Sequence, residues 1–222
     1  MSTDAAKITA CVNALRDVIP TSFILVGGAA ANMQGHGRVT QDVDILIRDP
    51  AILHDLKNFG GFKLVEGKLH HESVPIDILT TVVETFSYDE VKQAEAFESI
   101  QGIRFLKPDF ALAAKVRCSY LRQEDENGTS KRQSDLEDAI FWAEKLEEAG
   151  QQISDACAKL LPVSYYQVIL IRTYMDPEDF QKLVHAGLRK LLLPWEENSA
   201  EQREYYLCFA EESTDPFTVD FE

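Results

Sequence analysis

The stretch LVGGAAANMQGHGRVTQDVDILI, residues 25–47, decides the fold of this chain. Thirteen residues separate its double glycine, Gly27-Gly28, from two carboxylates one residue apart, Asp42 and Asp44. Side chains alternate between the two faces of a strand, so these two acids point the same way while the apolar residues beside them point the other way. Two like charges held side by side repel each other, and a divalent metal is the usual counter-charge. The stretch therefore predicts a metal site, with phosphate bound close to it.

The bulk composition describes an ordinary globular protein. The chain has 222 residues and a mass of 25.0 kDa, with 45% hydrophobic and 27% charged residues, which is enough for one large domain or two small ones. No apolar run approaches the roughly 20 residues that span a bilayer, and the first residues lack the pattern of a signal peptide. The four cysteines are scattered without C-x-x-C spacing. We therefore expect a cytoplasmic protein with reduced thiols and no membrane partner.

The charge is strongly acidic, at −15 for the whole chain. Residues 196–222 alone contain nine acidic residues and one basic residue, Arg203, and we interpret them as a solvated acidic surface. Such a chain is not expected to bind DNA through a broad electrostatic footprint. A nucleic-acid substrate would need a local basic strip, for which the candidates are Lys115, Arg117, Arg122, Lys131 and Arg132.

Hydrophobic patterning divides the chain into two parts. In residues 1–105 it predicts helices and strands in mixed order: a helix over 3–18, a strand over 23–26, a tight turn at Gly27-Gly28, a helix over 29–34, a strand over 42–47, a helix from Asp49 to 59, a hairpin over 62–66 and 69–72, and a strand over 74–79. Residues 106–222 read as mainly helical, with helices over 109–122 and 134–148, the second capped by Ser134, and a polar loop over 123–130 between them. The fold class is therefore α+β: a mixed sheet flanked by helices, followed by a mainly helical C-terminal region.

Asp77 is a third acid on a predicted strand, with Ile76 and Ile78 on the opposite face. If its strand lies beside that of Asp42 and Asp44, three carboxylates converge and can hold two metal ions about 3.5–4 Å apart. Oxygen ligands favour Mg²⁺ or Mn²⁺ over zinc. The alternative interpretation of Asp77 is a surface acid at the end of a strand.

The order of glycine pair, helix, Asp-x-Asp strand and later third acid resembles the DNA polymerase β-like nucleotidyltransferase superfamily. More narrowly, residues 25–30, Arg38, Thr40 and residues 42–44 are similar to the minimal nucleotidyltransferases related to abortive-infection type IV toxins. Lys115, Arg117 and the spacing Asp135-x-x-Asp138 resemble two helical motifs of that group. The resemblance covers about residues 20–145.

This resemblance implies transfer of a nucleoside monophosphate from an NTP, ATP included, to a hydroxyl acceptor, with release of pyrophosphate. It assigns metal binding to Asp42, Asp44 and Asp77, with Asp77 helping to activate the acceptor. Residues 1–105 would form the nucleotidyltransferase core, and residues 106–222 would complete its cleft. The nucleotide-binding residues would be Gly27, Gly28, Arg38, Thr40, Lys115 and Arg122.

Other interpretations stay open at this level. The same fold serves non-catalytic modules that bind a nucleotide or a protein, and toxin-like enzymes that act on tRNA. Retention of all three acids favours catalysis. Lys115 and Arg122 equally fit a solvated helix face, and Asp135 and Asp138 fit structural pairing with neighbouring bases. The motifs specify neither the NTP nor the acceptor, which is a small molecule, a protein or an RNA end.

Overall fold

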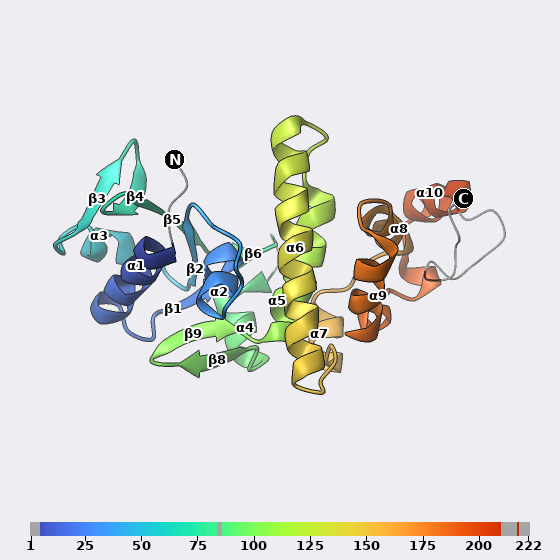
Figure 1. Ribbon diagram of the computed structural model, residues 1–222, viewed down its shortest axis with the longest axis horizontal. Helices are drawn as coiled ribbons and strands as arrows, with labels where there is room; N and C mark the ends of the chain where they lie inside the picture. The colour runs from blue at the N-terminus through green and yellow to red at the C-terminus, as the bar shows by residue number, and fades with distance from the viewer. Residues whose placement is uncertain (1–4, 84–85, 210–216, 218–222) are drawn as a thin grey trace. The chain divides into compact units, whose positions relative to one another are not determined.

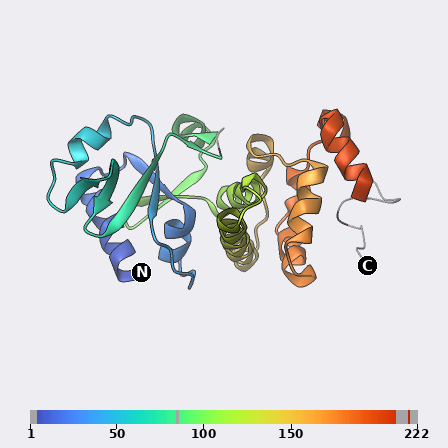
Figure 2. The same ribbon diagram turned by 90° about the horizontal axis from the view of Figure 1, so that it is seen from above.

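The computed structural model describes residues 5–83, 86–209 and 217 (Figure 1). The chain divides into two compact units, Met1–Lys107 and Pro108–Glu222. In Figures 1 and 2 the first unit runs from blue to green and contains the sheet, and the second runs from green to red and is mainly helical. The α+β class, with a mixed sheet, flanking helices and a mainly helical C-terminal region, is confirmed.

The described part of the first unit contains a seven-stranded mixed sheet of order β3-β4-β5-β2-β1-β9-β8 and a separate two-stranded ribbon, β6-β7. The strands are β1 (Phe23–Val26), β2 (Val43–Ile47), β3 (Phe62–Val65), β4 (Lys68–His71), β5 (Val74–Leu79), β6 (Thr81–Val82), β7 (Phe86–Ser87), β8 (Phe97–Ile100) and β9 (Ile103–Leu106). The helices are α1 (Ala5–Val18), α2 (Gly27–Met33), α3 (Ile52–Leu56) and α4 (Tyr88–Gln93).

The central strands are placed by apolar burial. All four residues of β1 are buried, as expected of a strand covered on both faces. The strand β2 runs antiparallel to β1 and parallel to β5, and its Val43 and Ile45 are buried while Asp44 is only partly covered. Helix α1 buries Ile8 and Leu15 in the core of this unit. The strands predicted over 23–26 and 74–79, the hairpin and the first helix are confirmed.

Two boundaries near the glycine pair differ from the prediction. The helix α2 begins at Gly27 rather than at Ala29, so the double glycine forms its first turn. The strand β2 begins at Val43, so Asp42 lies one residue before the strand rather than inside it. Strands β8 and β9 were not predicted from the sequence; they form an antiparallel pair beside β1.

The described part of the second unit is built from helices. They are α5 (Pro108–Leu121), α6 (Glu126–Glu148), α7 (Asp155–Leu160), α8 (Tyr165–Thr173), α9 (Pro177–His185), α10 (Ala200–Phe209) and two short 3-10 helices, η1 (Leu188–Leu191) and η2 (Trp195–Glu197). Helices α5 and α6 pack against each other. Among the described helices, none combines the length and the apolar character needed to cross a membrane.

The polar loop predicted over 123–130 is wrong for most of its length, because α6 begins at Glu126. The N-cap is Asp125, whose carboxylate accepts a hydrogen bond from the Gly128 amide at 2.6 Å. A Cβ at Gly128 would collide with the Gln123 carbonyl oxygen, so glycine is required for this tight start. Ser134, the predicted cap, lies in the middle of the helix.

Candidate active site

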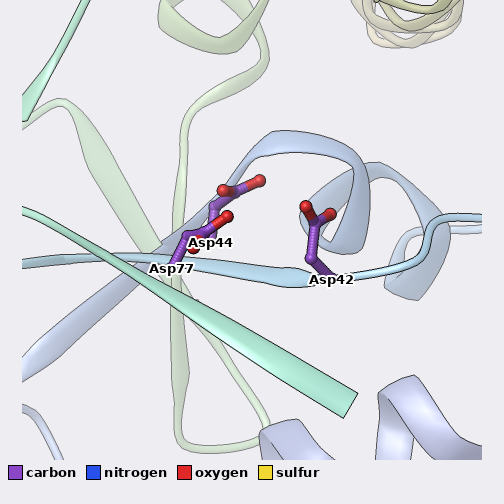
Figure 3. Close-up of side chains that lie close together, drawn as sticks. All are labelled: Asp42, Asp44 and Asp77. Atoms are coloured by element: carbon purple, nitrogen blue, oxygen red, sulfur yellow. The ribbon is translucent and has the colours of Figure 1, made fainter. Parts of the chain in front are cut away.

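Asp44 and Asp77 are neighbours across two parallel strands. In the pairing of β2 with β5, Val43 lies beside Ile76 and Asp44 beside Asp77. Paired residues in adjacent strands project to the same face of a sheet, so both carboxylates lie on the face away from the buried valine and isoleucine (Figure 3). The neighbouring position of the two strands that the prediction for Asp77 required is therefore present, and the two strands run parallel.

Asp42 completes the group from the residue before β2. Ligand oxygens of Asp42, Asp44 and Asp77 all lie within 4.8 Å of one another, and each residue is partly buried. The Thr40 hydroxyl donates a long hydrogen bond of 3.3 Å to Asp42 Oδ1. Three carboxylates at this separation form an oxygen-only donor set, which is the chemistry that Mg²⁺ or Mn²⁺ prefers.

The backbone of Gly27 closes one side of this group. Gly27 has a φ of +67°, and a Cβ built there would collide with the Asp44 carboxylate. Glycine is therefore required at this position for two reasons: the backbone is left-handed, and the Asp44 carboxylate lies where a side chain would begin. The signal was visible in the sequence as the first glycine after a buried strand.

Gly28 likewise leaves room for neighbouring side chains, because it has no Cβ. A Cβ there would lie 2.7 Å from Arg38 Nη2 and 2.9 Å from Thr40 Oγ1. The segment before β2 is held by Asn32, whose Nδ2 donates to the Arg38 carbonyl oxygen at 3.2 Å. The structure thus brings together Gly28, Arg38 and Thr40, beside the glycine and acids described above.

Lys68 is a part of this group that the sequence analysis missed. Its Nζ lies 2.7 Å from Asp77 Oδ1. The hydrogen bond to Asp77 is the largest of the effects that raise the pKa of Lys68, followed by the negative charges of Asp77, Asp42 and Asp44. Lys68 was predicted to lie in the hairpin turn. Its place beside Asp77 follows from the antiparallel pairing of β4 with β5, which the sequence analysis did not predict.

An open cavity of about 390 Å³ adjoins this pair. It is lined by Glu66, Gly67, Lys68, Leu69, Ile76, Asp77 and Ile78. The side chains that line it are thus partly charged and partly aliphatic, and Asp77 belongs both to the acidic group and to the cavity wall.

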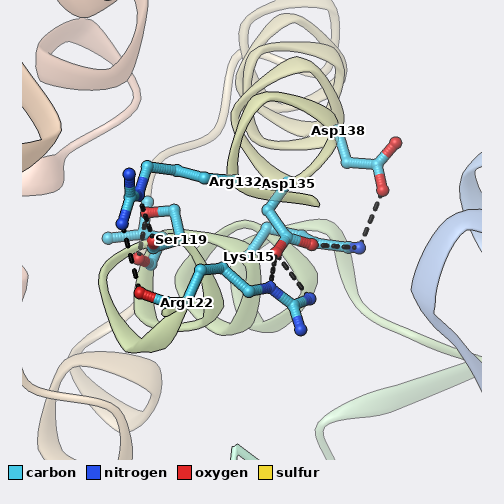
Figure 4. Close-up of polar contacts among 7 residues, drawn as sticks. Lys115, Ser119, Arg122, Arg132, Asp135 and Asp138 are labelled. Carbon is cyan, nitrogen blue, oxygen red and sulfur yellow. Dashed lines mark hydrogen bonds and ion pairs between the residues drawn. The ribbon is translucent and has the colours of Figure 1, made fainter. Parts of the chain in front are cut away.

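Lys115 and Arg122 lie in the second unit and form ion pairs there (Figure 4). Lys115 Nζ lies 2.9 Å from Asp135 Oδ1 and 2.8 Å from Asp138 Oδ2, and Arg122 Nη2 lies 2.6 Å from Asp135 Oδ2. Burial lowers the pKa of Lys115, but the two carboxylates outweigh it and raise the pKa overall. The side chain of Lys115 is only 14% exposed, so the interpretation of Lys115 as part of a solvated helix face is wrong. The structural pairing predicted for Asp135 and Asp138 is confirmed.

Two further members of the proposed basic strip, Arg132 and Arg117, are also engaged in internal contacts, whereas Lys131 is exposed. Arg132 is buried and donates to the carbonyl oxygens of Ser119 at 3.0 Å and Arg122 at 3.1 Å. Arg117 donates to the Pro162 carbonyl oxygen at 2.7 Å. Side chains with such internal partners are poorly suited to contact a nucleic-acid backbone.

No family model matches the chain, and no curated protein matches its sequence. Two solved structures are similar in fold. One is an antigenic nucleotidyltransferase-like protein from Paracoccidioides brasiliensis, with 18% identity and a TM-score of 0.49, covering 84% of this chain and 94% of that one. The other is a candidate nucleotidyltransferase from H. pylori, with 18% identity and a TM-score of 0.44, covering 92% of each chain. Both scores are below 0.5, so neither likeness carries weight for function.

Proposed function

We propose that this protein is a metal-dependent nucleotidyltransferase that moves a nucleoside monophosphate from an NTP to a hydroxyl acceptor and releases pyrophosphate. The observation that carries the proposal is the convergence of Asp42, Asp44 and Asp77 within 4.8 Å, against the backbone of Gly27. The order of glycine pair, helix, Asp-x-Asp and later third acid resembles the pattern of the DNA polymerase β-like superfamily, which supports the same reaction class.

The donor set fits Mg²⁺ or Mn²⁺, and Asp42, Asp44 and Asp77 would hold the metal. Bound there, the metal would neutralise charge on the triphosphate and would serve as a Lewis acid. Asp77 adjoins the open cavity and is the acid best placed to accept the proton of an acceptor hydroxyl. The acceptor oxygen attacks the α-phosphorus, the bond from that phosphorus to the bridging oxygen breaks, and the electron pair leaves with pyrophosphate.

The glycine pair and its neighbours would position the triphosphate. Because positions 27 and 28 carry no side chain, the Asp44 carboxylate comes close to Gly27, and the side chains of Arg38 and Thr40 come close to Gly28, at the start of α2. A guanidinium group binds phosphate oxygens in a planar, two-point geometry, so Arg38 is the side chain we assign to the nucleotide first. Nucleotide binding by Lys115 and Arg122 remains a prediction, because each already pairs with carboxylates of its own unit.

A tRNA-directed toxin is the less supported alternative, since Arg117, Arg122 and Arg132 all contact groups within their own unit. A non-catalytic binding module on this fold is the remaining alternative. We place the activity in the cytoplasm, where NTPs and Mg²⁺ are both abundant. The acceptor is a small molecule, a protein or an RNA end, and the first experiment separates these classes.

The test is incubation with each of the four α-labelled NTPs and Mg²⁺ or Mn²⁺, alone and with total RNA or cell extract. Asp44→Asn is the inactivating variant. Asp55→Asn is the matched control, because Asp55 is an exposed acid of the same unit that lies outside the acidic group. Label transferred by the wild type and by the Asp55 variant, but not by the Asp44 variant, supports the proposal and identifies the acceptor class. Metal-dependent nucleotide binding without transfer in any mixture favours the binding module.

A further inference from the structure

A lysine of the protein itself, Lys68, lies against the acidic group. Lys68 is the first residue of β4, and the pairing of Leu69 with Ile76 places it opposite Asp77 in the antiparallel ladder. Strand register therefore fixes its backbone beside the third acid. Its Nζ lies 2.7 Å from Asp77 Oδ1, with side chains 41% and 36% exposed, respectively.

This contact brings the ammonium group of Lys68 to a group of three carboxylates. The ammonium group of Lys68 is attracted by Asp77 and, at longer range, by Asp42 and Asp44. A divalent cation held by the same carboxylates would stand close to that ammonium group, and the two positive charges repel each other. Lys68 and a metal ion therefore compete for the Asp77 carboxylate.

The surroundings leave Lys68 room to move. Its side chain lines the open cavity of about 390 Å³ together with Glu66 and Asp77. A lysine side chain has four rotatable carbon bonds and a compact charge, so it changes position without disturbing the buried strands. Glu66 lies on the same cavity wall and offers a second carboxylate to the ammonium group when it leaves Asp77.

We propose that Lys68 is a positioning residue that acts as the internal counter-ion of the acidic group: it holds Asp77 in place and gives way to the divalent cation, moving into the adjoining cavity. This inference rests on the proposed function, because it requires metal binding at the three acids. It adds a regulatory consequence: the Lys68 ion pair sets the metal concentration at which Asp77 is released to act on the acceptor.

The first test measures Mn²⁺ binding by isothermal titration calorimetry, without nucleotide, in the wild type and in Lys68→Met. Methionine has a similar length and no charge, so the competing cation is removed. We expect the Kd for Mn²⁺ to fall about two- to fivefold, the size expected for loss of a partly exposed ion pair. Lys63→Met, which removes an exposed lysine from β3 of the same sheet, should leave the Kd unchanged, and Lys68→Arg should keep the wild-type value.

The second test follows Lys68 directly by acylation and mass spectrometry. Mn²⁺ should increase the labelling of Lys68 in the wild type, because the ammonium group leaves Asp77, and should have no such effect in Asp44→Asn. Unchanged or weaker Mn²⁺ binding in Lys68→Met, or metal binding without a change in Lys68 labelling, would overturn the inference and leave the proposed function intact. Absence of Mn²⁺ binding in both the wild type and Lys68→Met would overturn both the inference on Lys68 and the proposed function.

Discussion

Asp44 on β2 and Asp77 on β5 lie directly beside each other in a parallel strand pair, and their carboxylates project from the same face of the sheet. A protein selected for stability alone would not place two acids in this register, because like charges directly opposite each other are destabilising. Lys68 brings a positive charge to Asp77, but ligand oxygens of Asp42 and Asp44 lie within 4.8 Å of one another and of Asp77. A loss of stability of this kind agrees with the metal site that we propose for these acids.

The charge repulsion in the acidic group should be visible as a gain in stability when one acid is neutralised. In EDTA, Asp42→Asn is expected to raise the free energy of unfolding by about 1 kcal/mol, because it removes one negative charge from the group and keeps an oxygen for the Thr40 hydroxyl. Urea denaturation measures the change, with Asp55→Asn as the control for surface charge. In Mg²⁺ the wild type should instead be more stable than Asp42→Asn, since the wild type gains stability from the bound ion. Equal stability of both variants in EDTA would contradict the prediction.

Gly27 is expected to be irreplaceable for metal binding. Gly27→Ala should cost about 1–3 kcal/mol in stability, because its φ is +67°, and should displace the Asp44 carboxylate that lies against it. Gly35→Ala is the control, since Gly35 also has a positive φ, +103°, but no atom lies within 4 Å of an added Cβ. Both variants should lose stability in urea denaturation, but only Gly27→Ala should lose Mn²⁺ binding in calorimetry. Similar Mn²⁺ affinities in the two would exclude a special role for Gly27.

The buried ion pairs between α5 and α6 should matter far more than an exposed pair of the same unit. Lys115→Met removes the ammonium group that contacts Asp135 Oδ1 and Asp138 Oδ2, and we expect a loss of about 3–5 kcal/mol in the free energy of unfolding. Lys182→Met, which removes a lysine that pairs with Asp179 and Glu144 at the surface, should cost about 1 kcal/mol or less. Chemical denaturation followed by circular dichroism compares the two. Equal losses would mean that the Lys115 network is not a stabilising element.

The start of α6 can be tested by removing the two candidate caps. Asp125→Ala should destabilise the protein by about 1 kcal/mol, because the Gly128 amide loses its acceptor at the helix start. Ser134→Ala should change stability by about 0.5 kcal/mol or less, because a serine within a helix has no such role. The readout is the urea midpoint of each variant. A larger effect at Ser134 would place the helix start where the sequence pattern predicted it.

The buried thiols should make the protein less stable at alkaline pH. Burial raises the pKa of Cys11 to about 12, with a smaller contribution from Glu72, and burial also raises the pKa of Cys157. An unfolded thiol ionises near pH 9, so the stabilising contribution of each buried thiol is fully present below that pH. It is lost as the pH rises toward the pKa of the folded state, by about 1 kcal/mol per cysteine at pH 10.

Urea denaturation at pH 8 and pH 10 measures this loss, and Cys157→Ala should show a shallower dependence on pH than the wild type. Labelling with a thiol reagent provides an independent check. Cys208 is exposed and should react first, Cys118 more slowly, and Cys11 and Cys157 only on unfolding. An unchanged pH dependence in Cys157→Ala would show that other groups cause the alkaline loss.

The difference between prediction and structure follows the range of the interactions involved. The apolar run of β1 and the apolar residues of α1 were predicted correctly, because local periodicity and burial act together there. The start of α6 was predicted wrongly, because residues 123–130 look like a polar loop and only the Asp125 cap and Gly128 reveal the helix. Lys115 was read as equally suited to phosphate or to solvent, since its two aspartates lie on another helix.

The sequence by itself determined the strands over 23–26 and 74–79, the glycine pair and the spacing of Asp42 and Asp44, since these features depend on residues that are close together in the chain. Only the tertiary structure decided that β5 pairs with β2 in parallel and in the register that sets Asp77 beside Asp44. It alone also brought Lys68 to that carboxylate. Strand partners and register depend on contacts between distant segments, whose free energies no local pattern records.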